Sequence, residues 1–123
     1  NAQIQVPFAM FGPKITKQSQ NWDGQFTAHQ DIAPTIARNY LGVRNDLVDY
    51  SVGVDLLGEP VARNWLIASQ YSGYGIVTDD YIVEVGAAGN YQLLDKTNRP
   101  SSTLKLDAQY LKEAFEQMSL YNK

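Results

Sequence analysis

Hydrophobic residues recur every three or four positions in two segments of the chain, and this spacing predicts two amphipathic helices. The first helix lies within residues 29–43. Asp31 is its predicted N-cap, because a carboxylate at this position can accept hydrogen bonds from the free N–H groups of the first turn. Gly42 suits the left-handed backbone conformation that often ends a helix. The stripe predicted to be buried comprises Ile32, Ala33, Ile36, Ala37, Tyr40 and Leu41.

The second helix is predicted near the C-terminus, from Ala108 to about Leu120, with Asp107 as its N-cap. Lys112 and Glu116 are four residues apart, and this spacing allows a weak ion pair on the exposed side of the helix. The stripe predicted to face the core comprises Leu111, Ala114, Phe115 and Met118.

Between the two helices, short β-prone runs alternate with short polar turns, which predicts an antiparallel meander. Its four strands are expected at residues 65–69, 74–78, 81–85 and 90–94. Residues 4–11 are mostly apolar and predict a further strand, in which Pro7 should lie at a sheet edge or near the start of the strand. The predicted fold class is therefore α+β, a four-stranded antiparallel sheet packed against two main helices plus an N-terminal strand.

The composition of the chain argues against several classes of function. The chain has 123 residues, 44% of them hydrophobic, which suits one domain with a sizeable core. Its net charge of −3 argues against nucleic acid as a partner, because a nucleic-acid binder needs a basic face. The chain contains no cysteine, which excludes disulfides, thiolate metal sites and cysteine nucleophiles. Asn1 and Ala2 are interpreted as the remnant of an expression tag, so residues 3–123 are expected to be a fragment of a longer protein.

The sequence holds no complete catalytic or metal-binding motif. No glycine-rich phosphate loop is present, and no serine lies in a nucleophile-elbow motif. A zinc site needs several nitrogen or sulfur ligands, which one histidine and no cysteine do not supply. Asp79, Asp80 and Glu84 are spaced closely enough to bind a hard cation, but they lack a calcium-loop pattern and are better interpreted as a solvated hairpin turn. We therefore assign no catalytic residue and no metal ligand.

The candidate site residues are His29 and Gln30, directly before the first predicted helix. A helix N-terminus carries partial positive charge and free N–H groups, so it attracts sulfate or phosphate. His29 and Gln30 are therefore a possible anion-binding site or the rim of an active site. The alternative interpretation, that His29 only hydrogen-bonds the backbone or a neighbouring loop, stays open.

Three segments, taken in order, resemble the sulfatase-like proteins of the alkaline phosphatase superfamily. Residues 6–13 are similar to a strand of the family that contains Val-Pro. Residues 29–43 read His-x-Asp-Ile-x-Pro-Thr-Ile followed by Leu-Gly-Val and are similar to a helix late in the family's sequence. Residues 49–57 resemble the connector after that helix, and their Tyr-Ser-x-Gly-x-Asp-Leu run is most similar to the inner-membrane YejM (PbgA) type.

The resemblance implies that residues 3–123 are the C-terminal, sulfatase-like subdomain of a hydrolase of sulfate or phosphate esters. The nucleophile and the divalent metal ligands of that family lie upstream of the Val-Pro strand. No catalytic residue therefore transfers to this chain, and no cofactor is expected in the fragment alone. The family further implies a protein anchored in the inner membrane by upstream helices, with this part on the periplasmic side. The chain's partner is then the upstream catalytic domain of the same polypeptide.

The same resemblance implies an alternative function. Proteins of the YejM type are associated with lipopolysaccharide and cardiolipin homeostasis, which indicates a non-enzymatic periplasmic regulator that binds lipid or a membrane protein. A third and weaker interpretation is an independent α+β binding module. We also expect an exposed apolar patch along residues 6–11, where a strand edge would allow two copies to dimerise.

Overall fold

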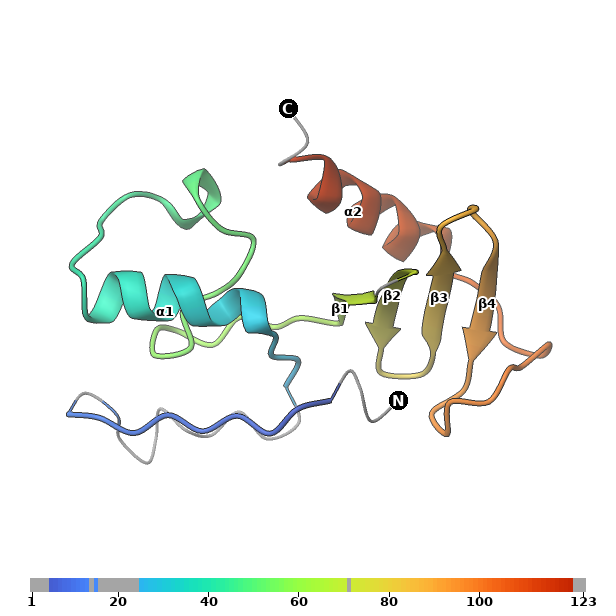
Figure 1. Ribbon diagram of the computed structural model, residues 1–123, viewed down its shortest axis with the longest axis horizontal. Helices are drawn as coiled ribbons and strands as arrows, with labels where there is room; N and C mark the ends of the chain where they lie inside the picture. The colour runs from blue at the N-terminus through green and yellow to red at the C-terminus, as the bar shows by residue number, and fades with distance from the viewer. Residues whose placement is uncertain (1–4, 14, 16–24, 71, 121–123) are drawn as a thin grey trace. The chain divides into compact units, whose positions relative to one another are not determined.

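The computed structural model describes residues 5–13, 15, 25–70 and 72–120 (Figure 1). The two residues interpreted as a tag remnant lie outside these ranges. The chain divides into two compact units, one formed mainly by residues from Asn64 onward and the other by Pro7–Arg63. Within the described residues, no helix is both long enough and apolar enough to cross a bilayer.

The first unit contains a four-stranded antiparallel sheet whose strands follow one another in chain order. The strands are β1 (Trp65–Gln70), β2 (Gly73–Thr78), β3 (Ile82–Gly86) and β4 (Tyr91–Leu94). Each is joined to the next by a short turn, and together they form the predicted meander. The α+β class, with this sheet and two helices, is therefore confirmed.

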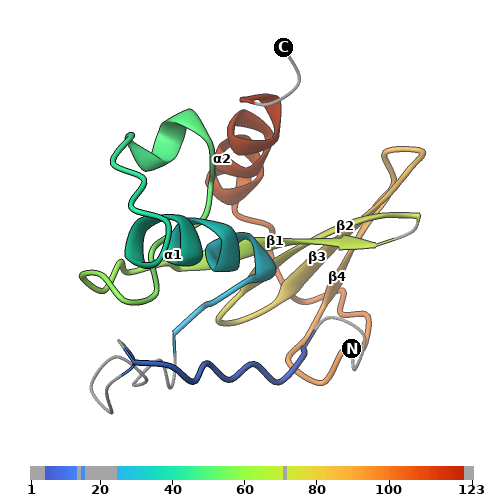
Figure 2. The ribbon, with the colours of Figure 1, turned by 60° about the vertical axis from the view of Figure 1, so that its left-hand side comes forward.

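Helix α2 (Ala108–Ser119) lies on one face of this sheet (Figure 2). The register places Ile76 of β2 opposite Ile67 of β1 and Val83 of β3, so these side chains point to the same face. Ile76 and Val83 have no exposed surface, and Ala114 of α2 is equally buried against them. The sheet unit thus has its own hydrophobic core.

One polar contact caps α2, and two others hold the helix on the sheet. The Asp107 carboxylate accepts a hydrogen bond from the Gln109 N–H at 2.9 Å, which confirms the predicted N-cap. The Asp107 N–H donates to the Tyr81 hydroxyl at 3.1 Å, and the Trp65 indole N–H donates to Glu113 at 2.9 Å. Both bonds join the helix to the sheet, so α2 cannot slide without breaking them.

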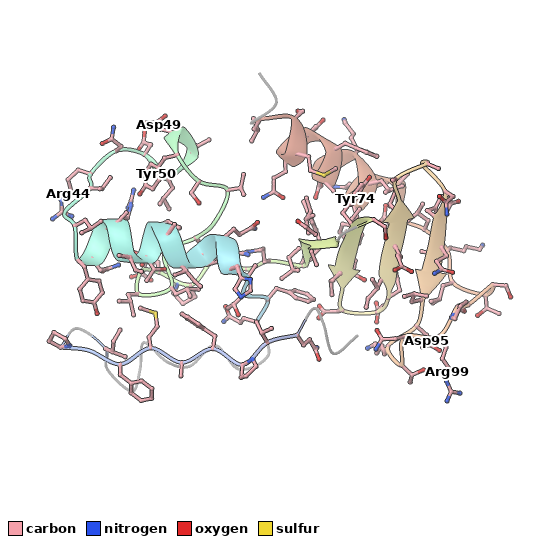
Figure 3. The ribbon with its side chains drawn as sticks, viewed as in Figure 1. Arg44, Asp49, Tyr50, Tyr74, Asp95 and Arg99 are labelled. Carbon is pink, nitrogen blue, oxygen red and sulfur yellow. The ribbon has the colours of Figure 1, made fainter. Side chains whose placement is uncertain are left out.

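On the exposed side of α2, the structure confirms the predicted ion pair but also exposes Phe115, which was expected in the core. Lys112 and Glu116 approach to 3.8 Å, as expected from their spacing. Phe115 was predicted to be buried but is 53% exposed. Its ring packs edge-on against that of Tyr74, with centroids 6.3 Å apart. Burial raises the pKa of the phenol of Tyr74, which Figure 3 labels. Phe115 therefore lies at the border of the core rather than inside it.

The second unit is built around helix α1 (Ile32–Asn39). A single 3-10 turn, His29–Asp31, leads into the helix, and another, Leu47–Asp49, follows it. Gly42 adopts the expected left-handed conformation, with a φ of 72°, although the helix itself ends at Asn39, before the predicted position. The Val43 N–H then reaches back to the Ala37 carbonyl at 3.0 Å across this turn.

The predicted buried stripe of α1 is wrong. Ile36 and Tyr40 are each 41% exposed, and Leu41 is 73% exposed. The buried side of the helix instead carries Pro34 and Thr35, with Asp31 directly before it. The reason is that residues 51–56 pass along this side and form hydrogen bonds there, which leaves the apolar stripe outside.

The predicted N-terminal strand is also wrong for residues 5–11, the part of it that the structure describes. These residues form no strand. Pro7 cannot donate a hydrogen bond, and no described strand lies in register with the segment, so it has no sheet to join. The expected exposed apolar patch is confirmed, since Val6 and Phe8 are 50% exposed and Phe11 is 89% exposed. Dimerisation through this segment stays a prediction.

Candidate functional site

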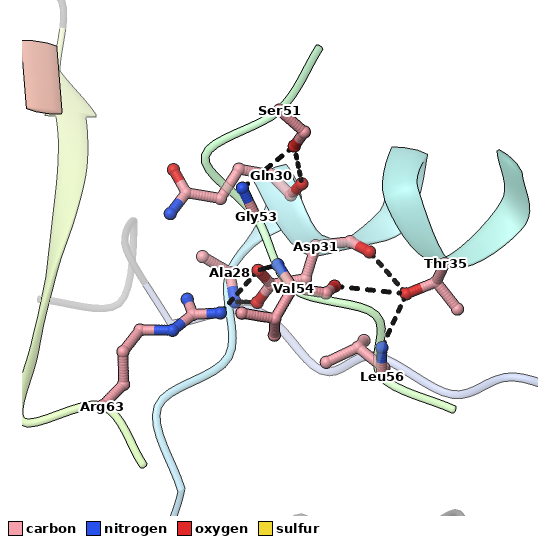
Figure 4. Close-up of polar contacts among 9 residues, drawn as sticks. All are labelled: Ala28, Gln30, Asp31, Thr35, Ser51, Gly53, Val54, Leu56 and Arg63. Carbon is pink, nitrogen blue, oxygen red and sulfur yellow. Dashed lines mark hydrogen bonds and ion pairs between the residues drawn. The ribbon is translucent and has the colours of Figure 1, made fainter. Parts of the chain in front are cut away.

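The carboxylate of Asp31 lies at the start of α1 and has no exposed surface. It accepts three hydrogen bonds: from the Ala28 N–H at 2.7 Å, from the Val54 N–H at 2.9 Å and from Arg63 Nη2 at 2.7 Å (Figure 4). This differs from the predicted N-cap, because the side chain accepts no bond from the first turn of α1. Asp31 instead joins the helix to two distant parts of the chain.

Thr35 extends the same network one turn along α1. Its side chain is fully buried, and its hydroxyl donates to the Asp31 carbonyl at 2.6 Å. The same oxygen accepts the Leu56 N–H at 2.9 Å. Farther along the helix, the Asn39 amide donates to the Asp55 carboxylate at 2.8 Å. Three side chains on one side of α1 thus hold residues 54–56.

Residues 49–57, the connector, lie with their backbone against the 3-10 turn His29–Asp31 that leads into α1. A Cβ atom built on Gly53 would lie 2.0 Å from the Gln30 carbonyl oxygen, so only glycine fits at this position. The Ser51 hydroxyl spans the same contact, donating to the Gln30 carbonyl at 3.4 Å and accepting the Gly53 N–H at 2.9 Å. We call the set of Asp31, Thr35, Arg63 and residues 51–56 the Asp31 clamp.

The Asp31 clamp has the chemistry of a structural connection. A buried carboxylate is costly unless charge and hydrogen bonds compensate it, and here Arg63 supplies the charge while two N–H groups supply further bonds. With three donors on its two oxygens, Asp31 is held in one orientation. The clamp therefore fixes the start of α1 relative to the connector.

The candidate residues His29 and Gln30 lie in the turn directly before Asp31. The His29 side chain is exposed, whereas Gln30 is partly buried and contributes its carbonyl oxygen to the contact with Ser51. Figure 4 shows the Gln30 side chain pointing away from the Asp31 carboxylate. The rim or anion-binding role of these two residues stays a prediction.

The three acidic residues that were weighed as a cation site are distributed over the β2–β3 hairpin. Asp79 and Asp80 are exposed at its turn, and Asp80 lies 3.5 Å from the Lys96 amine. Glu84 lies inside β3 and accepts a hydrogen bond from Gln92 at 2.6 Å. In the part of the chain that the structure describes, no three acidic or histidine side chains gather closely enough to hold a metal ion.

The sequence indicated Asp31 but missed Thr35, Arg63 and Gly53, the other residues on which the Asp31 clamp depends. Thr35 lies four residues after Asp31, a spacing that puts both on one side of a helix. That signal was available, but hydrophobic periodicity assigned the opposite side to the core. Arg63 is 32 positions away from Asp31, and nothing local marks it as the partner.

Comparison with known proteins adds no family to this description. The chain matches no protein-family model, and it matches no curated protein.

Proposed function

We propose that this chain is the non-catalytic C-terminal part of a sulfatase- or phosphoesterase-type hydrolase, where α1 braces the catalytic domain that precedes it. The observation that carries the proposal is the exposed apolar surface at the end of α1, formed by Ile36 in the helix and by Tyr40 and Leu41 directly after it. An amphipathic helix normally buries its apolar side, so an exposed one indicates a surface that another part of the protein covers.

The Asp31 clamp supports the same proposal. Two of the three segments that resemble the sulfatase-like family, residues 29–43 and 49–57, are joined by this network. By burying the polar side of α1, the clamp turns Ile36 and Leu41 outward and holds them in place. A rigid apolar surface loses little conformational entropy on docking, which suits a bracing role.

In this proposal the catalytic groups lie in another part of the longer protein. Its upstream domain supplies the nucleophile and holds the divalent metal, on the periplasmic side of the inner membrane. His29 and Gln30 then lie at the rim of the active site or contact the anionic part of the substrate. The chain itself supplies position and support.

The first experiment is to read the coding sequence upstream of residue 3. We expect a Thr or Ser nucleophile with Asp and His metal ligands there. An upstream sequence without these residues contradicts the enzymatic proposal and favours the alternative, a non-enzymatic periplasmic regulator. That alternative then requires the whole periplasmic domain to bind vesicles containing cardiolipin or lipopolysaccharide.

The second experiment tests the bracing surface in the full-length protein. Ile36→Asp and Leu41→Asp place a charge on the exposed apolar surface of α1 and of the residues directly after it. We expect each to lower thermal stability and hydrolysis of an aryl ester. Val48→Asp is the matched control, because Val48 is 67% exposed but lies in the later 3-10 turn, Leu47–Asp49, and is not one of the three residues that form the proposed bracing surface. Equal behaviour of all three variants and the unaltered protein would contradict the proposal.

The third experiment uses the isolated chain. It should not hydrolyse aryl sulfate or aryl phosphate with added Mg²⁺, Mn²⁺ or Zn²⁺. Metal-dependent turnover that His29→Ala abolishes would show instead that the chain carries its own active site.

A further inference from the structure

The two edges of the sheet differ in how they are protected. At β4, the chain after the strand folds back along the outer edge. Leu94 forms a bridge with Pro100, and the Ser101 N–H donates to the Leu93 carbonyl at 2.9 Å. The end of this edge, at Leu93 and Leu94, is therefore covered by the chain itself.

The described residues form no such cover along the outer edge of β1. Among the described residues, β1 pairs with β2 alone and forms no backbone hydrogen bond on its other side. Its residues, Trp65–Gln70, include no charge and no proline, the two features that most often keep edge strands from pairing. An open, uncharged edge is a template for another β-strand, because main-chain hydrogen bonds supply the affinity.

The strand is also complementary to itself. When two copies of β1 run antiparallel about a two-fold axis at Ile67, Trp65 lies opposite Ser69 and Leu66 lies opposite Ala68. Directly opposed side chains in an antiparallel pair point to the same face. Trp65 then meets a small side chain on one face of the joined sheet and Leu66 meets one on the other face. Ile67 packs against its own symmetry mate, and no like charges oppose each other.

We propose that a second copy of this chain pairs antiparallel with β1 and joins the two sheets into one. A six-residue strand is about 20 Å long, so the edge alone buries less surface than a standard protein interface. The dimer is therefore weak and forms in the micromolar range or above. Residues 5–11, where dimerisation was predicted, contain no strand that could offer such an edge.

The test introduces a positive or a negative side chain at Ala68 in the full 123-residue chain. In the proposed register, Ala68 and its symmetry mate are diagonal neighbours about 7–8 Å apart. Ala68→Lys and Ala68→Glu each place like charges together in the dimer only, and we expect the dimer dissociation constant to rise at least tenfold in sedimentation equilibrium. An equimolar mixture of the two variants should dimerise again, because opposite charges then face each other.

Gln92→Lys is the matched control, since it adds the same charge to the exposed part of the protected edge, on β4. Circular dichroism of the dilute variants checks that each one folds. Amide hydrogen exchange of the unaltered chain gives a second measurement, and we expect protection of β1 amides to increase with protein concentration. The proposal is overturned if the chain stays monomeric at millimolar concentration. It is also overturned if both Ala68 variants dimerise normally, as they would through α1 or residues 5–11, or if their mixture stays monomeric.

Discussion

The guanidinium of Arg63 donates to the buried carboxylate of Asp31 at 2.7 Å, across 32 positions of the sequence. This ion pair closes the second unit, because Arg63 is its last residue and Asp31 begins its helix. The Arg63 side chain is 16% exposed and that of Asp31 is not exposed at all. Breaking such a pair therefore leaves one charge with little access to water.

Asp31→Asn should destabilise the α1 unit by about 3 kcal/mol, the lower end for removing one partner of a buried ion pair. The amide keeps the shape of the side chain but leaves Arg63 without its counter-charge. The measurement is amide hydrogen exchange of α1 residues, which reports local opening even if the sheet unit unfolds separately. A double-mutant cycle with Arg63→Gln isolates the pair, and a coupling near zero would contradict its assigned role.

Thr35→Val should cost about 1–3 kcal/mol in the same unit, because the change is nearly isosteric and removes the hydroxyl that accepts the Leu56 N–H. Thr35→Ser keeps the hydroxyl and is the matched control, with a smaller loss. The Leu56 amide is the reporter, and we expect its exchange to accelerate in the valine variant alone. Equal exchange in both variants would mean that the hydroxyl contributes nothing to holding the connector.

The elements that the sequence predicted correctly are those in which local pattern and final burial agree. The four strands and α2 bury the sides that their hydrophobic spacing indicates, as Ile76, Val83 and Ala114 show. A short meander and a capped helix need few distant contacts to form. Their bounds could therefore be predicted from neighbouring residues alone.

The side that α1 buries could not be predicted in this way. Its hydrophobic spacing is clear, but the partners of Asp31 and Thr35 are the connector residues Val54 and Leu56, more than 20 positions farther along the chain. Hydrogen bonds to those backbone N–H groups decide which side of the helix is covered. The same non-local dependence explains residues 5–11, whose β-prone sequence finds no strand to pair with in the described structure.

Gly53→Ala should destabilise the α1 unit by about 3 kcal/mol, the upper end for overpacking, since the new methyl group meets a backbone oxygen rather than a movable side chain. The connector must then move away from Gln30, which also weakens the bond between Ser51 and the Gly53 N–H. Gly75→Ala is the control, because a Cβ there meets nothing closer than 3.7 Å. The measurement is the thermal unfolding of both variants. Equal stability would contradict the close contact between Gly53 and the Gln30 carbonyl.

Asp95 gives the fold a pH dependence in the turn after β4, where Figure 3 places it near Arg99. Its carboxylate accepts the Thr97 hydroxyl at 2.6 Å and the Arg99 N–H at 3.1 Å. These two bonds, the Thr97 hydroxyl first, lower the pKa of Asp95 below its usual value. Because the folded-state pKa is lowered, the stabilisation is complete above the unfolded value of about 3.9 and is lost as the pH falls through the lower folded value.

We therefore expect the turn at residues 95–99 to stay ordered at neutral pH and to loosen in acid. Thr97→Val should raise the Asp95 pKa toward its ordinary value, because the strongest of the bonds to the carboxylate is removed. Thr103→Val is the matched control, since the Thr103 hydroxyl lies 3.1 Å from that of Ser101. The chemical shift of the Asp95 carboxyl carbon, followed by NMR during acid titration, gives the midpoint directly. A midpoint that is the same in both variants would show that the Thr97 hydroxyl does not hold the charge, and that the turn owes its acid sensitivity to backbone N–H groups alone.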